Sequence, residues 1–214
     1  MEQAERAIIG ADVAHHVLDP DGVLGLDPFQ ASSLDTALER LREVEPEGWF
    51  LCLPVPGSLA PLRGPAAFNS AALEHGEAVV ASSAGAGLVP MRSGPAVQWR
   101  VFAAERPLAP ASPYDAERAL NEVILTAAAA LSKLDVAAGR RPAPADGPML
   151  APGYSNRQRA TAERAARLLA ICDAALGNDG ASISAFEADR RAGELRRVRA
   201  LAGEALGAAV SWLT

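Results

Sequence analysis

The spacing of apolar residues changes from one period to another at Ser112-Pro113. Before that point Val97, Trp99 and Val101 alternate with other residues, as they do along a β-strand with two distinct faces. After it, apolar residues recur every three or four positions, which is typical of an amphipathic helix: Leu120, Ile124, Ala127, Leu131 and Leu134. We therefore predict an α+β fold, with a mixed, sheet-containing portion at 1–110 and a helical portion at 111–214 joined into one compact unit.

Four strands are expected in the first portion. The first is the apolar run from Trp49 to Val55, which is bounded by Gly48 and by prolines that cannot donate to a ladder. Both of its faces are apolar, so we expect it in the middle of the sheet or under a helix. The others are expected at 78–82, 88–91 and 97–103, with Gly85-Ala86-Gly87 in a turn. Because tight turns join these last three strands, the pattern predicts an antiparallel meander.

Helices and loops complete the expected order. Residues 1–32 contain turn signals and predict a surface loop, although Glu2 to His16 could form a short helix. Short helices are expected at 33–46 and at 65–76, the second with Phe68 and Leu73 facing inward.

The helical portion is expected to hold three helices. The first runs from Ser112 towards Gly139, and a proline-rich loop follows at 140–153. Capping-box patterns, Ser155 with Gln158 and Ser184 with Glu187, start the other two, and the last may run nearly to Thr214. We expect these two to form an antiparallel hairpin.

The charge balance disfavours several classes of partner. The net charge is −6, and it divides unevenly: 14 acids against 7 Arg in 1–110, but 12 acids against 13 basic residues in 111–214. An acidic chain is not typical of a protein that binds nucleic acid or an anionic membrane. Only Cys52 and Cys172 are present, no signal-peptide pattern opens the sequence, and no apolar run spans a bilayer. The chain is expected to be cytoplasmic.

The motifs of common enzymes are missing. His15, His16 and His75 have no second ligand at metal spacing, so no metal site is predicted. Gly85-Ala86-Gly87 runs into a strand, not into the helix that a dinucleotide site needs, so no cofactor is predicted. Cys52 lies in an apolar strand and is interpreted as a packed thiol. We assign no catalytic residue, and the sequence leaves open whether the chain is an enzyme.

One stretch retains the chemistry of a ligand site. Arg63-Gly64-Pro65 precedes a short helix, so free backbone N–H groups and the guanidinium of Arg63 could hold an anion or carboxylate. Asn69 lies one turn further on, and Arg100 in the last strand is the other candidate. The alternative is that Arg63 pairs with a surface acid and that Arg100 pairs with Glu77 or lies on a solvated face.

Three functions remain open. The first is a non-catalytic binding or scaffold protein, a homo-oligomer or a partner subunit, acting through its alanine-rich helical half. The second is a small enzyme or ligand-binding domain with an anion site at the 57–69 loop, where Arg63, Gly64, Asn69 and Arg100 orient the ligand. The third is nucleic-acid binding through the arginines of the last two helices, which their mixture with acids and the lack of interleaved aromatics disfavour.

Overall fold

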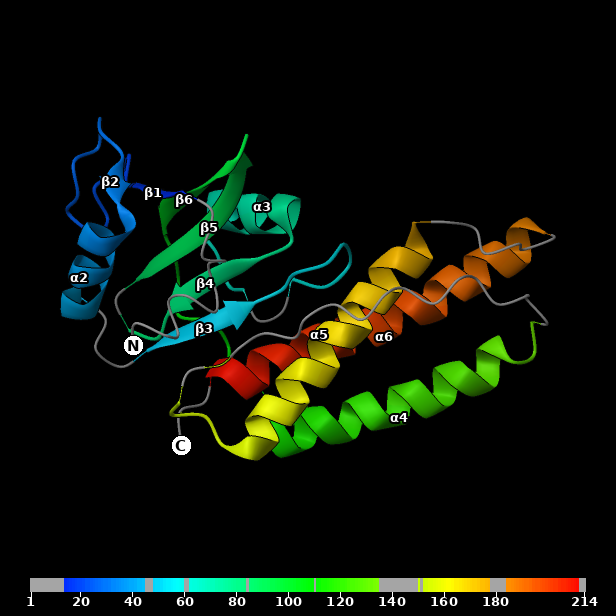
Figure 1. Cartoon of the computed structure of the whole chain (residues 1–214). Helices are drawn as coiled ribbons and strands as arrows, with labels where there is room; N and C mark the ends of the chain where they lie inside the picture. The colour runs from blue at the N-terminus through cyan, green and yellow to red at the C-terminus, as the bar shows by residue number, and fades with distance from the viewer. Residues whose placement is uncertain are drawn as a thin grey trace. The chain divides into compact units, whose positions relative to one another are not determined.

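The computed structural model of the chain describes residues 14–44, 48–59, 62–83, 85–109, 111–134, 150, 152–177 and 184–211. Packing contacts divide the chain into two units, one made of residues 1–110 with 150–152, the other of 111–149 with 153–214. Among the described residues, those of the first unit form a sheet with helices and those of the second form helices, so the α+β class is confirmed (Figure 1).

Four neighbouring strands form the predicted meander. They are β3 (Trp49–Cys52), β4 (Ala78–Ala81), β5 (Ala86–Ser93) and β6 (Ala96–Ala103). Each pairs antiparallel with the next, and β5 and β6 stay in register from Ala86↔Ala103 to Ser93↔Ala96. Exposed Gly94, with φ of 59°, supplies the left-handed backbone conformation that the tight β5–β6 turn requires.

The prediction of a loop throughout residues 1–32 is wrong. Strand β1 (His15–Leu18) pairs parallel with β6, and β2 (Ser32–Ser33) pairs antiparallel with β1. The sheet order is therefore β2-β1-β6-β5-β4-β3. Val17 is fully buried in this sheet. Four residues are too few to display an alternating pattern, and the parallel partner lies about eighty positions away in the sequence, so no local signal marks this strand.

Two details of the predicted meander also differ. The run at 49–55 forms strand β3 at the edge of the sheet and not in its middle. The alternative position under a helix is confirmed, since buried Cys52 packs in one cluster with Phe68 and Ala72 of the helix Ala66–His75. Gly87 lies inside β5 and not in a turn. Packing explains why this position is glycine, since a Cβ at Gly87 would lie 2.6 Å from two ring atoms of Phe68.

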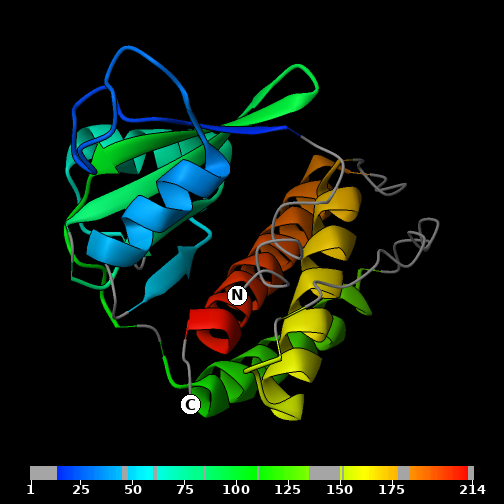
Figure 2. The same ribbon diagram turned by 60° about the vertical axis from the view of Figure 1, so that its left-hand side comes forward.

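The sheet carries one helix on each face (Figure 2). Helix α2 (Leu34–Val44) covers Val17, Leu88 and Val101 with Ala37 and Leu41. Helix α3 (Ala66–His75) covers the opposite face with Phe68 and Ala72. Phe68 is 1% exposed, and burying a side chain of this size stabilises a fold by about 2–3 kcal/mol. Both helices were predicted, although Leu73 is only half-buried where an inward position was expected.

The second unit contains the three expected helices. They are α4 (Pro113–Leu131), α5 (Asn156–Leu176) and α6 (Ala185–Ser211). Gln158 near the start of α5 donates to Ala209 O near the end of α6, and Arg191 near the start of α6 donates to Ala175 O near the end of α5. Helices α5 and α6 are thus antiparallel, as predicted. An ion pair between Arg157 and Glu117 joins the first turns of α5 and α4.

Some predictions fall outside the described residues. They concern the N-terminal part of the possible helix at Glu2 to His16, the end of the helix at 33–46, most of the loop at 140–153, and the last residues to Thr214.

Candidate functional site

The start of α3 holds three of the four predicted site residues. Gly64 is buried with φ of 131°, and its carbonyl accepts a 2.9 Å hydrogen bond from Glu105 N–H. The carboxylate of Glu105 lies beside it, since its Oε1 would be 3.5 Å from a Cβ at this glycine. Pro65 occupies the N-cap and offers no side-chain cap. The acidic neighbour lies where a bound anion was expected, so an anion here would meet electrostatic repulsion.

Asn69 presents a different chemistry. Its N–H donates to Pro65 O at 3.0 Å, whereas its Oδ1 is buried and accepts no hydrogen bond from a described residue. A buried carbonyl oxygen without a donor costs about 1–3 kcal/mol. Such an acceptor favours an N–H or O–H group over the anion that the sequence suggested.

The two predicted arginines, Arg63 and Arg100, interact differently with the rest of the chain. Arg63 is exposed and forms no ion pair or hydrogen bond with any described residue, so the surface acid expected as its partner is not found in that part of the chain. Arg100 places its guanidinium 5.0 Å from the ring centroid of Phe102, a cation–π distance. Phe102 in turn contacts Phe68 of α3, with centroids 5.9 Å apart. The structure therefore connects Arg100 to α3 through the rings of Phe102 and Phe68.

Glu77 is not paired with Arg100. Burial raises the pKa of its carboxyl, and the charges of Arg92 and His75 act in the opposite direction. Glu77 thus interacts electrostatically with Arg92, whereas Arg100 was the predicted partner.

A buried carboxylate that the sequence reasoning missed organises the loop after β1. Asp19 is 1% exposed, and its two oxygens accept the N–H groups of Val23, Leu24 and Leu26 at 2.8, 2.9 and 3.1 Å. Arg40 of α2 adds a bond of 2.6 Å from Nε to Leu24 O. The turn pattern Asp19-Pro20-Asp21-Gly22 was the available signal. With every oxygen engaged by backbone, Asp19 is a structural group.

Neither cysteine has the surroundings of a nucleophile. Both thiols are free and buried. Burial raises the pKa of Cys52 to about 12 and, together with the nearby Asp173 charge, that of Cys172 to about 11. Such thiols stay protonated near neutral pH, in accord with the interpretation of Cys52 as a packed residue.

The histidines form no metal cluster. No group of three His, Cys, Asp or Glu within the described ranges could hold a metal ion. His15 lies on β1, where its Nδ1 accepts the indole N–H of Trp99 at 3.1 Å.

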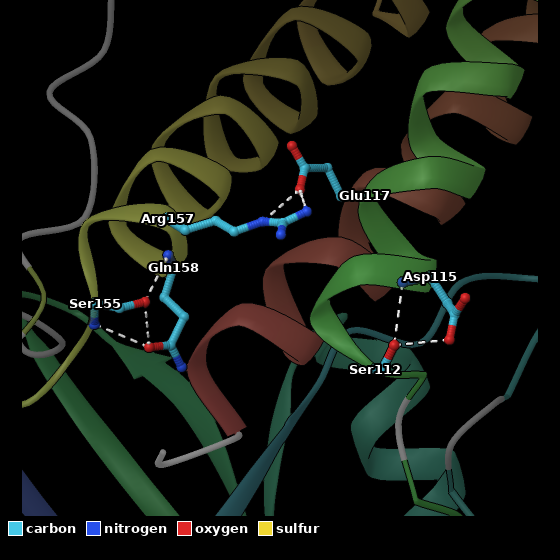
Figure 3. Close-up of polar contacts among 6 residues, drawn as sticks. All are labelled: Ser112, Asp115, Glu117, Ser155, Arg157 and Gln158. Atoms are coloured by element: carbon cyan, nitrogen blue, oxygen red, sulfur yellow. Dashed lines mark hydrogen bonds and ion pairs between the residues drawn. The ribbon is translucent and has the colours of Figure 1, made fainter.

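Polar contacts of the helical unit cap and join its helices (Figure 3). Ser112 accepts from Asp115 N–H, and Ser155 and Gln158 form the complete capping box. Arg157 donates to Glu117 from Nε and from a terminal nitrogen, at 3.0 and 2.7 Å, and lies 5.4 Å from the Tyr114 ring. These contacts cap and join the helices of the bundle.

Other arginines of the hairpin are also used within it. Arg199 pairs with Asp173, Arg197 with Glu194, and Arg159 donates to Tyr154 O. With Arg157 and Arg191, five arginines of α5 and α6 are thus engaged in contacts of the bundle itself.

Two large apolar side chains are also exposed on the helical unit. Leu125 on α4 is 72% exposed and Phe186 on α6 is 68% exposed. None of the described helices is both long and apolar enough to cross a lipid bilayer.

Two family models match the chain. Residues 1–115 match the model described as "Rv1486c-like protein, N-terminal domain", and residues 114–207 match "Rv1486c-like protein, C-terminal domain". No curated protein and no solved structure matches the chain.

Proposed function

For this chain, which belongs to the Rv1486c-like protein family, we propose the role of a non-catalytic binding or scaffold protein. It acts through its helical unit, which associates with a second copy of the chain or serves as a subunit beside a partner. In keeping with its free, buried cysteines, the protein works in the reducing cytoplasm.

The observation that carries the proposal is the exposure of Leu125 in the middle of α4. The core-facing side of that helix is made by Ala116, Leu120, Val123 and Ala127, all buried. At 100° per residue Leu125 lies about 140° from Leu120, so it points away from the core of its own bundle. A leucine held in water there forgoes roughly 1.5–3 kcal/mol of burial, which a protein partner would recover.

Small residues suit the same role. Ala128 and Ala129 follow Leu125 on the exposed side of α4. Side chains of this size let another helix approach closely, and merging such faces gives the apolar centre of a dimer interface. A stable interface of this kind buries on the order of 1,200–2,000 Å² in total.

The ligand-binding alternative has weaker support. Its anion site would lie beside the carboxylate of Glu105, and the guanidinium of Arg100 already stacks on Phe102. Nucleic-acid binding is supported only by the arginine content of the hairpin, and several of these arginines take part in contacts of the bundle.

The mass in solution tests the proposal. For a homodimer, light scattering behind size exclusion will give twice the 22.2 kDa chain mass at high protein concentration. Leu125→Lys will return it to that of one chain, whereas Thr126→Lys at the neighbouring exposed position is the matched control and will leave it doubled. A single-chain mass at every concentration, with no partner subunit co-purifying from cells that make the protein, contradicts the proposal.

A further inference from the structure

Phe29 is the most exposed large apolar side chain among the described residues. It is 97% exposed, more than any helical residue of that kind. It lies in the loop between β1 and β2, in the sheet-containing unit, so it is separate from the helical surface proposed above. Burying its ring against a partner would contribute roughly 1.5–3 kcal/mol of hydrophobic stabilisation.

The loop that carries Phe29 is fixed by the fold. Asp19 binds three backbone N–H groups at its base, and Leu24 is buried under α2 with its carbonyl bonded to Arg40. Asp27 Oδ1 accepts the N–H of Phe29 itself at 2.9 Å. A side chain presented on a backbone already ordered loses little entropy when a partner binds it.

The charge around Phe29 restricts the partner. From Val17 to Glu39 the chain carries five acids (Asp19, Asp21, Asp27, Asp35 and Glu39) and no Lys or Arg. Asp21 and Asp27 are exposed on the loop itself. The nearest Lys or Arg along the sequence, Arg40, is already bonded to Leu24 O and to Glu43.

Two other occupants fit this charge poorly. A two-fold contact between copies would bring two acidic loops together, which is repulsive. A bilayer with anionic lipids would repel the same carboxylates.

We propose that Phe29 is an anchor with which the sheet-containing unit binds a second, different protein, one that offers an apolar pocket rimmed by Lys or Arg. The ring fills the pocket, and Asp21 and Asp27 face its basic rim. This binding is independent of association through the helical unit, so either can fail without the other.

Site-specific photo-crosslinking in cells that make the protein tests the proposal. The full chain carries p-benzoylphenylalanine at Phe29 or, as matched control, at exposed Ser93, the last residue of β5. The adduct specific to position 29 is identified, and that protein is purified and titrated against the full chain. We expect Phe29→Ser to weaken its Kd at least tenfold, Asp27→Asn to weaken it less, and added salt to weaken binding of the wild type.

Phe29→Ser will leave thermal unfolding unchanged because the ring touches water, which separates lost binding from lost folding. The proposal is overturned if position 29 gives no adduct beyond that of position 93. An adduct with a second copy or with lipid, or a purified partner that binds Phe29→Ser as tightly as the wild type, overturns it as well.

Discussion

The buried cores of the two units differ in the size of their side chains. In the sheet-containing unit, large side chains fit closely into the sheet, as Phe68 does over Gly87. The helical unit has an interior dominated by alanine: Ala116, Ala127, Ala165, Ala202, Ala205 and Ala208. Its specificity comes from caps and from contacts between helix ends. The first unit should therefore be sensitive to single changes in its core and buried loop, and the second should respond by smaller steps.

Each unit contains one buried, free cysteine, which allows the two to be followed separately. Cys52 reports on the sheet-containing unit and Cys172 on the helical unit. A thiol reagent can reach either only when its surroundings open, so the labelling rate of each gives the local free energy of opening.

The largest expected effect is that of Asp19→Ala. Three backbone N–H groups, one buried and two partly buried, would lose their acceptor, which should cost roughly 3 kcal/mol. Urea unfolding followed by Cys52 labelling measures it. Asp21→Ala, two positions away and exposed, is the control and should stay within about 0.5 kcal/mol of the wild type. Equal values for the two variants would show that the loop after β1 does not depend on its buried carboxylate.

Gly87→Ala comes next, at about 1–3 kcal/mol. The added methyl would lie 2.6 Å from the Phe68 ring and 3.0 Å from the Ala104 Cβ, so α3 must shift away from the sheet. The same urea and Cys52 measurement applies. Combining it with Phe68→Leu should cost less than the sum of the two single changes, because the smaller side chain makes room. Strict additivity would refute the close fit.

A cap of the helical unit should matter less. Ser155→Ala removes the acceptor of Gln158 N–H and should destabilise the helical unit by about 1 kcal/mol, as read from Cys172 labelling. Ser155→Thr retains a capping hydroxyl and serves as control. A loss as large as that of Asp19→Ala would remove the contrast between the units.

The smallest effect belongs to the ion pair between Arg157 and Glu117, because the guanidinium side chain is 59% exposed. A double-mutant cycle to alanine should give a coupling of about 0.5 kcal/mol, reduced by salt. Arg164→Ala at an exposed position of the same helix is the control. A coupling above about 2 kcal/mol would contradict the small contribution expected of this exposed contact.

The same contrast explains what the sequence could predict. Helix starts such as Ser112-Pro113 and Ser155 with Gln158 are local signals, and both appear in the structure where they were expected. The part of the meander formed by β4, β5 and β6 was recognisable because a short turn separates each of these strands from the next. Strand β1 was missed because its parallel partner is β6, far along the chain, and Asp19 was missed because its burial depends on that strand.

The candidate site was less predictable than the fold. Gly64 and Asn69 do lie at a helix start as expected, but the carboxylate of Glu105 arrives from a segment some forty residues later. By contrast, the alternation of the last strand already places Arg100 and Phe102 on the same face, two positions apart, where they stack. Whether Arg63, Gly64, Asn69 and Arg100 bind a ligand stays a prediction.

The central claim, that association belongs to the helical unit, is tested most directly by hydrogen exchange of the full chain at low and high protein concentration. We predict that raising the concentration, or adding the partner subunit at equal chain concentration, will slow exchange in α4 around Leu125 and leave β5 and β6 unchanged. Protection that grows in the sheet instead, or exchange that is the same throughout the chain under all these conditions, would contradict the account.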